Sequence, residues 1–395
     1  MERKRRFYFY YAAMCLLLFL TQFANTTQGV LLTDHIEHYG LASTTQGLIS
    51  TAQSAGASLA VLALIFLSGR IRNHVLLGIG AGLIVVSMAL LGSAPPFALL
   101  LLLYLCFGMG FGSISSISSA QSSLMFPGNA FAMGLMHAFF GVGGLLGPVV
   151  FSNLRHAAGL PWNAVCLVAA AVALVLFAFY ASAAWRTREA LSSLGSRQQV
   201  VHFSDILTFF KRKRNLLLML SILGYAAFQN GYNIWIVRYF SNGLGAVAIA
   251  AGSLSLFWVS NTVARFAIPK LPLRAETTVA LGCLLAAACT ALGVLCGNAT
   301  LMLVCACLAG FFSGPSIPQF YHLSCSWNPE RPLMASSFTS IMMYLSWTIT
   351  APLTAALNGG GRWTGGMLLV ALYALIGGLA LLPVMLRGKR GAPTA

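Results

Sequence analysis

The chain alternates between long apolar runs and short polar segments along its whole length. Each run reaches the ~20 apolar residues that an α-helix needs to cross a bilayer core of ~30 Å. The runs are continuous and lack the period-two alternation that is typical of membrane β-barrels. The sequence therefore predicts twelve membrane-spanning helices, over residues 8–33, 42–68, 75–93, 97–119, 131–153, 162–183, 215–240, 245–266, 277–296, 299–322, 332–357 and 363–385.

Composition indicates the same class. Of the 395 residues, 58% are hydrophobic and 8% are charged, whereas a soluble domain carries about a quarter charged residues. A soluble protein of this length would have too few charges to cover its surface. This excludes a cytosolic enzyme, a secreted domain and a disordered chain. The predicted fold class is an all-α membrane protein embedded in the lipid bilayer.

Basic residues are distributed unevenly over the predicted loops. The net charge is +16, yet the predicted outer loops hold only Arg155, Arg238 and Arg362 of the 23 lysines and arginines. Because basic residues favour the cytoplasmic side, both termini are predicted to be cytoplasmic. The distribution of basic residues thus indicates which side of the membrane each loop faces, and no nucleic-acid partner is expected. In this assignment Arg265 belongs to a cytoplasmic segment, and no basic residue lies at mid-membrane.

One long polar segment, residues 184–214, divides the chain into two groups of six spans. The groups cover residues 1–183 and 215–395, and a shift of about 204 residues places Asn25 on Gln229. Such duplicated halves around a central site are an architecture of transporters. The sequence therefore predicts two pseudo-symmetric six-helix bundles joined by a basic cytoplasmic linker.

Amide, hydroxyl and aromatic side chains inside the spans form a candidate solute site. Tyr225, Gln229 and Asn233 follow helical spacing and share one face of their span. A buried amide without a partner costs about 1–3 kcal/mol, so these groups must pair with one another, with water or with a solute. The predicted substrate-binding residues are Asn25, Gln28, Gln53, Tyr225, Gln229, Asn230, Asn233, Trp235, Asn261, Gln319, Tyr344 and Trp347.

This set of side chains suits a small neutral polyhydroxylated solute. Amides both donate and accept hydrogen bonds, and aromatic rings offer flat faces. An organic anion fits less well, because no basic residue is expected at mid-membrane. The alternative interpretation is that the polar residues hold helices together, which we favour for the serine stripe over residues 115–123.

Several stretches resemble the major facilitator superfamily, and within it the fucose permease-like branch. They are residues 24–49 in spans 1 and 2, 137–148 in span 5, 235–239 at the end of span 7 and 314–318 in span 10. The resemblance implies the major facilitator fold, transport by alternating access, and a cavity lined by spans 1 and 7. The loop over residues 68–74 departs from the superfamily pattern, because it is shortened and lacks the acidic residue.

The resemblance also concerns proton coupling. Proton-coupled members of the branch tend to carry acidic residues where this chain has Gly29 and Ser115, and often where it has Gln229. Coupling through a buried carboxylate is therefore disfavoured. Facilitated diffusion, a cation held by neutral oxygens, and coupling through His137 or His322 stay open, since histidine titrates near physiological pH. His137 has a second interpretation as a hydrogen-bonded residue between helices.

Two further features concern motion. Asp34 and Arg238 end spans 1 and 7 at repeat-equivalent places on the outer side, which predicts a salt bridge that acts as an outer gate. Gly143, Gly147 and Pro148 in span 5 predict a close helix approach combined with a proline-weakened helix.

The sequence thus predicts a monomeric, multi-pass transporter of the bacterial inner membrane that moves a small neutral polar solute, a sugar or sugar-like compound. A multidrug or organic-solute efflux transporter of the same superfamily is the alternative. No metal triad, nucleophile–base pair or phosphate loop appears, so we expect neither an enzyme nor a cofactor or metal. The nine cysteines are interpreted as small packing residues.

Overall fold

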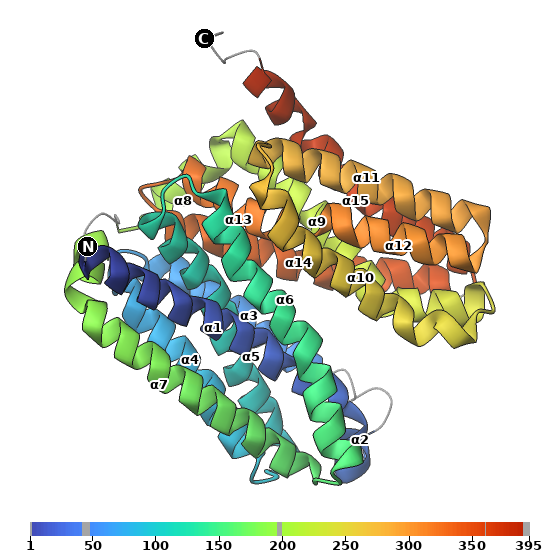
Figure 1. The fold of residues 1–395 in the computed structure, drawn as a ribbon, viewed down its shortest axis with the longest axis horizontal. Helices are drawn as coiled ribbons and strands as arrows, with labels where there is room; N and C mark the ends of the chain where they lie inside the picture. Colours follow the sequence, from blue (N-terminus) through green and yellow to red (C-terminus); the bar gives the residue numbers. More distant parts are fainter. Residues whose placement is uncertain (1, 42–47, 196–199, 360, 390–395) are drawn as a thin grey trace. The chain divides into compact units, whose positions relative to one another are not determined.

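The structure is a computed structural model that describes residues 2–41, 48–195, 200–359 and 361–389 (Figure 1). Within these ranges the chain is helical, and no strand occurs. The helices fall into two compact units. Unit 1 comprises Met1–Gly128, Leu135–His202 and Cys325–Ser340, and unit 2 comprises Asn129–Gly134, Phe203–Ser324 and Ile341–Ala395. The main division, after His202, lies inside the polar segment 184–214.

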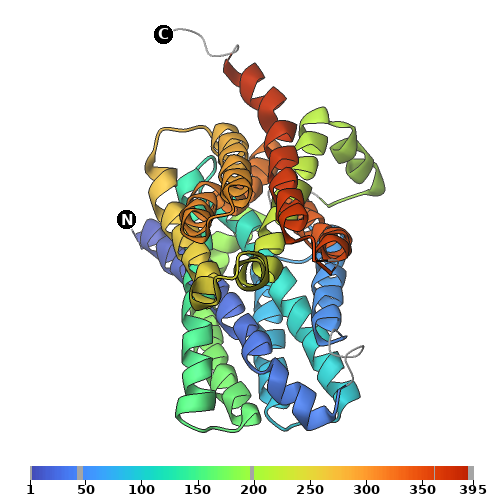
Figure 2. The same ribbon diagram turned by 90° about the vertical axis from the view of Figure 1, so that its right-hand side faces the viewer.

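Unit 1 is built around α5. This helix packs along α3 and α4, while α7 packs against α1 and α4; the helices are coloured blue to green in Figures 1 and 2. A π-helical turn, Asn153–Ala157, extends α6. The helices are α1 (Glu2–Val30), α2 (Leu32–Tyr39), α3 (Leu48–Leu67), α4 (Asn73–Leu91), α5 (Phe97–Met125), most of α6 (Ala130–Ser152) and α7 (Trp162–Gly195).

Unit 2 is built around α9, α11 and α15. The α15 helix packs on α9 and α11, and α12 packs on α10 and α11. The helices are α8 (Phe203–Lys211), α9 (Lys213–Arg238), α10 (Val247–Ala267), α11 (Ala275–Cys296), α12 (Ala299–Ser313), most of α13 (Ser316–Trp327), the larger part of α14 (Pro332–Gly359) and α15 (Trp363–Lys389). The turns Tyr239–Gly243 and Ile268–Lys270 follow α9 and α10.

A helix occupies every span that the sequence predicts, with α12 and α13 together forming the tenth. Ten stretches of the described residues are long and apolar enough to cross a membrane. Two long helices, α9 and α14, fall outside this group because they carry many amide and hydroxyl side chains. These helices correspond to predicted spans 7 and 11. The predicted all-α membrane fold is confirmed.

The tenth span is interrupted at Gly314 and Pro315. Proline has no N–H to donate to the preceding turn, so α12 ends at Ser313 and α13 begins at Ser316. A side chain at Gly314 would lie 2.4 Å from the carbonyl oxygen of Asn261. Only glycine therefore lets α10 approach the break this closely.

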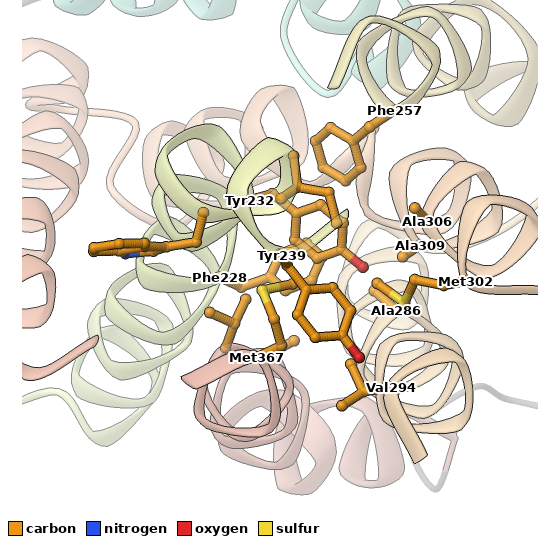
Figure 3. Close-up of a cluster of buried hydrophobic side chains, with 14 of the residues drawn as sticks. Phe228, Tyr232, Tyr239, Phe257, Ala286, Val294, Met302, Ala306, Ala309 and Met367 are labelled. Atoms are coloured by element: carbon orange, nitrogen blue, oxygen red, sulfur yellow. The ribbon is translucent and has the colours of Figure 1, made fainter. Parts of the chain in front are cut away.

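The apolar core of unit 2 lies among α9, α10, α11, α12 and α15 (Figure 3). The Tyr232 ring stacks on Phe257 with centroids 4.5 Å apart, and its hydroxyl bonds to Thr290 Oγ1 at 2.7 Å. Small residues such as Ala286 and Ala306 face these rings. Large rings against small side chains fill the core without voids, which fixes the positions of α9 and α10 for the polar cluster described next.

Candidate functional site

In unit 1, a chain of amide hydrogen bonds links α1 to α3. Gln53 donates from Nε2 to Oδ1 of Asn25, and Asn25 donates from Nδ2 to Oε1 of Gln22 at 3.3 Å. Further along α1, Gln28 donates from Nε2 to Ser50 Oγ at 2.8 Å. The structure thus brings the three predicted residues of this unit, Asn25, Gln28 and Gln53, to one helix pair. Among the described residues, the buried Oε1 of Gln53 has no hydrogen-bond donor.

In unit 2, a second polar cluster surrounds the hydroxyl of Tyr225. Gln229, one turn further along α9, donates from Nε2 to this hydroxyl at 3.1 Å. Asn261 of α10 also bonds to the hydroxyl and donates from Nδ2 to the carbonyl oxygen of Gly310 at 3.3 Å. All three side chains are buried. The structure therefore joins Tyr225, Gln229 and Asn261, which come from two different predicted spans.

Arg265 belongs to this cluster. Its side chain is 1% exposed, whereas the sequence-based topology counts it among the charges of a cytoplasmic segment. It bonds to the Tyr225 hydroxyl, and its Nε donates to the carbonyl oxygen of Gly314 at 3.1 Å. Its Cζ atom lies 6.0 Å from the ring centroid of Trp258.

Two details of the chain explain why Arg265 is buried. The residue occupies the last turn of α10, where a basic residue would normally extend into the headgroups, but α10 ends against the break between α12 and α13. Its neighbours Ala264 and Phe266 are apolar. That apolar context is the signal in the sequence that could have identified Arg265 as a buried residue. The expectation that no basic residue lies at mid-membrane stays a prediction.

Two predicted residues near the end of α9 have other partners. Asn233 accepts a hydrogen bond from Trp258 Nε1 at 2.9 Å. Trp235 belongs to the apolar core of unit 2 and packs near Trp363, with ring centroids 6.4 Å apart. Helical spacing placed these side chains on the face of Tyr225, and their hydrogen-bond and ring partners are Trp258 and Trp363.

The remaining predicted residues are Asn230, Gln319, Tyr344 and Trp347. Gln319 is buried in α13, and its Oε1 has no hydrogen-bond donor among the described residues. Tyr344 is buried in α14, while Asn230 is partly exposed on α9. The side chain of Trp347 lies outside the described part of the chain.

The carboxylate of Asp34 has a different partner from the predicted one. Arg155, in the turn after α6, donates from Nε to Asp34 Oδ1 at 2.7 Å. Arg238 lies in the other unit, where its Cζ is 5.6 Å from the ring centroid of Trp235. Both partners of the observed pair belong to unit 1, so this ion pair fixes α2 to the end of α6. The gate between Asp34 and Arg238 stays a prediction.

The two candidate coupling histidines differ in their surroundings. His137 is buried in α6, and its Nε2 lies 3.1 Å from Ser119 Oγ of α5, which agrees with the interpretation as a hydrogen-bonded residue between helices. His322 lies in α13, where the Glu276 carboxylate acts on it electrostatically. In the serine stripe, Ser116 Oγ lies 2.7 Å from Ser340 Oγ of α14, as expected of a residue that holds helices together.

The span 5 glycines lie at a close contact between α6 and α1. A side chain at Gly143 would meet the backbone oxygen of Phe19 at 2.3 Å, and one at Gly147 would meet Thr26 Oγ1 at 2.1 Å. Pro148 lies inside α6 directly after them. Within the described residues, no group of three or more His, Cys, Asp or Glu side chains is arranged to hold a metal ion.

Comparisons with known proteins agree with this architecture. The family model described as Major Facilitator Superfamily matches residues 14–300. A comparison with curated sequences finds no match.

Solved structures with the same fold include two of FucP and one human protein. A single-residue variant of the E. coli fucose:proton symporter FucP has a TM-score of 0.75 at 16% identity, covering 94% of this chain and 97% of that chain. FucP in the outward conformation has a TM-score of 0.72 at 17% identity, with the same coverage. The human organic anion transporter MFSD10 (TETRAN) has a TM-score of 0.75 at 15% identity, covering 95% and 99%. On its family match and its fold, the chain belongs to the major facilitator superfamily of membrane transporters.

Proposed function

We propose that the protein moves a small polyhydroxylated solute, a sugar or sugar-like compound, across the bacterial inner membrane by alternating access. The observation that carries this proposal is the buried cluster of Tyr225, Gln229 and Asn261 in unit 2. Amide and phenol groups in the interior of membrane helices can each donate and accept, which matches the hydroxyls of a sugar.

The amide chain of Asn25 and Gln53 supports the same proposal. Its groups lie on α1 and α3, so each unit supplies polar groups from two helices. A fucose:proton symporter among the structural neighbours also favours a sugar-like solute. The organic anion transporter has the same fold, so the fold itself does not select the solute.

A ligand panel on the purified protein tests this proposal. Monosaccharides and glycosides should raise the melting temperature, because a ligand at 100 times its Kd adds about 2.7 kcal/mol to the stability of the folded state. Gln229→Leu should abolish most of that shift. Ser241→Ala, at a partly exposed position in the turn after α9, is the control and should respond as the original protein does. Stabilisation by lipophilic cations alone would contradict the proposal and favour efflux of drug-like solutes.

A further inference from the structure

The short helix α8 (Phe203–Lys211) has an apolar side that the protein covers only in part. Phe203 and Leu207 lie one turn apart on the same side of the helix, and they are 70% and 48% exposed. Phe209, on the neighbouring side, is buried, and α8 packs on α9. The apolar surface of α8 thus continues from its packed side onto an exposed side.

The opposite side of α8 is polar. Ser204 and Thr208 are exposed there, and Thr208 Oγ1 donates to the carbonyl oxygen of Ser204 at 2.8 Å. Helices with one apolar and one hydrated side lie in the plane of a membrane interface, where the apolar side chains enter the boundary between headgroups and acyl chains. The pattern of α8 therefore fits a lipid surface.

Four consecutive basic residues mark the end of this helix. Residues 211–214 read Lys-Arg-Lys-Arg, and all four are exposed. Asp205 is the one acidic residue of the segment 203–214, so the net charge of the segment is +3 with this acid included. Basic residues directly beside a membrane-crossing helix are attracted to anionic lipid headgroups.

The junction of α8 and α9 holds the apolar and basic parts together. Asn215, in the first turn of α9, is buried, and its Nδ2 donates to the carbonyl oxygen of Phe209 at 3.0 Å. Lys213 begins α9, which corresponds to the predicted span over residues 215–240. The four charges therefore lie where this span is expected to enter the bilayer.

We propose that α8 and residues 211–214 form a binding surface for anionic phospholipids of the surrounding bilayer. Phe203 and Leu207 insert beside the acyl chains, while the basic side chains bind the headgroup phosphates. The strength of such binding grows with the buried apolar area and with the attraction to anionic lipid, so the two parts reinforce each other. This inference goes beyond the proposed function, because it holds for any transported solute.

Hydrogen–deuterium exchange of the unaltered protein provides the first test. The protein is placed in nanodiscs of phosphatidylcholine alone, or of equal parts phosphatidylcholine and phosphatidylglycerol. Exchange of the α8 amides should be about fivefold or more slower with the anionic lipid, because lipid binding makes local opening of the helix rarer. The turn Tyr239–Gly243, at the other end of α9, contains no lysine or arginine; it is the internal control and should exchange equally in both nanodiscs.

Substitutions at exposed positions provide the second test. Phosphatidylglycerol is titrated into the purified protein in neutral detergent, and the melting temperature gives its Kd. The double variant Lys211→Gln/Lys213→Gln should raise this Kd about tenfold or more. The matched control is Arg70→Gln/Arg72→Gln, which removes two exposed charges from the segment between α3 and α4 and should keep the Kd.

The apolar side of α8 has a variant of its own. Phe203→Ser/Leu207→Ser leaves every charge in place and should abolish most of the slower exchange of α8 in nanodiscs with phosphatidylglycerol. Equal exchange of α8 in the two nanodiscs would overturn the inference. An equal rise in Kd for the lysine variant and the arginine control would also overturn it, because lipid binding would then follow the total charge of the protein and not this surface.

Discussion

His35 lies in an aromatic enclosure in the middle of α2. Its ring is 4.9 Å from that of Trp162, 5.9 Å from Tyr104 and 6.5 Å from Tyr39, measured between centroids. The side chain is fully buried, and neither ring nitrogen has a hydrogen-bond partner among the described residues. Burial lowers the pKa of His35 to about 4, against the opposing influence of the Asp34 carboxylate, and His38 lowers it further.

This residue predicts a loss of stability in mild acid. In the unfolded chain a histidine titrates near pH 6.5, so between about pH 6.5 and pH 4 the unfolded state binds more protons than the folded state. Stability from the neutral His35 is complete above pH 6.5 and falls as the pH drops toward 4, by a total on the order of 3 kcal/mol. The melting temperature measured from pH 8 to pH 4 checks this.

His35→Phe keeps the ring and removes the titration, so its melting temperature should fall less steeply over the same interval. His156→Gln, at an exposed position, is the control and should follow the unaltered protein. Parallel curves for all three proteins would show that His35 does not contribute to the pH dependence.

At the scale of elements, the close contact between α1 and α6 predicts that adding one methyl group at this contact lowers the stability of the protein. In Gly143→Ala the new Cβ would overlap the backbone oxygen of Phe19, which cannot move without moving α1. Overpacking of this kind costs about 1–3 kcal/mol. The expected result is a melting temperature several degrees lower than that of the unaltered protein, measured in detergent.

Gly82→Ala is the matched control, because nothing lies within 4 Å of a side chain at that α4 position. Alanine has the higher helix propensity, so this variant should be neutral or slightly more stable. Equal melting temperatures for Gly143→Ala and Gly82→Ala would show that α1 and α6 are not in close contact in the protein.

The sequence predicts elements well but predicts contacts between them only in part. Long runs of mainly apolar residues locate the long helices, although amide and hydroxyl side chains lower the hydropathy of α9 and α14. The glycines of span 5 indicate a close approach, because small residues are typical of contacts between membrane helices. The partner of Asp34 could not be predicted, because the spacing on one helix defines a face and not the neighbour that covers it.

Arg265 shows the same limit more sharply. Its position at the end of a predicted span is typical of a cytoplasmic charge, and only the break at Gly314 in another helix turns it inward. Spacing within α9 alone relates Gln229 to Tyr225, whereas Asn261 and Arg265 join them through tertiary packing. For a site assembled from several helices, the sequence therefore identifies individual polar residues. Which of them lie together, and that a charged side chain lies among them, is seen only in the structure.

At the scale of the whole molecule, the resemblance to the fucose permease-like branch predicts the driving force. The resemblance implies acidic residues in proton-coupled members where this chain has Gly29, Ser115 and Gln229, and none of these three can carry a proton. If the solute is neutral and no proton accompanies it, a transport cycle moves no net charge. Uptake should then follow the solute gradient and respond to neither the membrane potential nor a pH gradient.

Proteoliposomes with an imposed potassium diffusion potential measure this directly. A potential of about 100 mV would contribute about 2.3 kcal/mol if one charge moved with the solute, which corresponds to about 50-fold accumulation, so a charged cycle would be detected. Neither this potential nor a pH gradient at zero potential should change the initial rate of D-glucose uptake more than about twofold. Uptake driven by the pH gradient would instead require a proton carrier. His137→Gln would then test the α6 residue beside Ser119, because loss of pH-driven uptake would assign the proton to His137 and retention would exclude it.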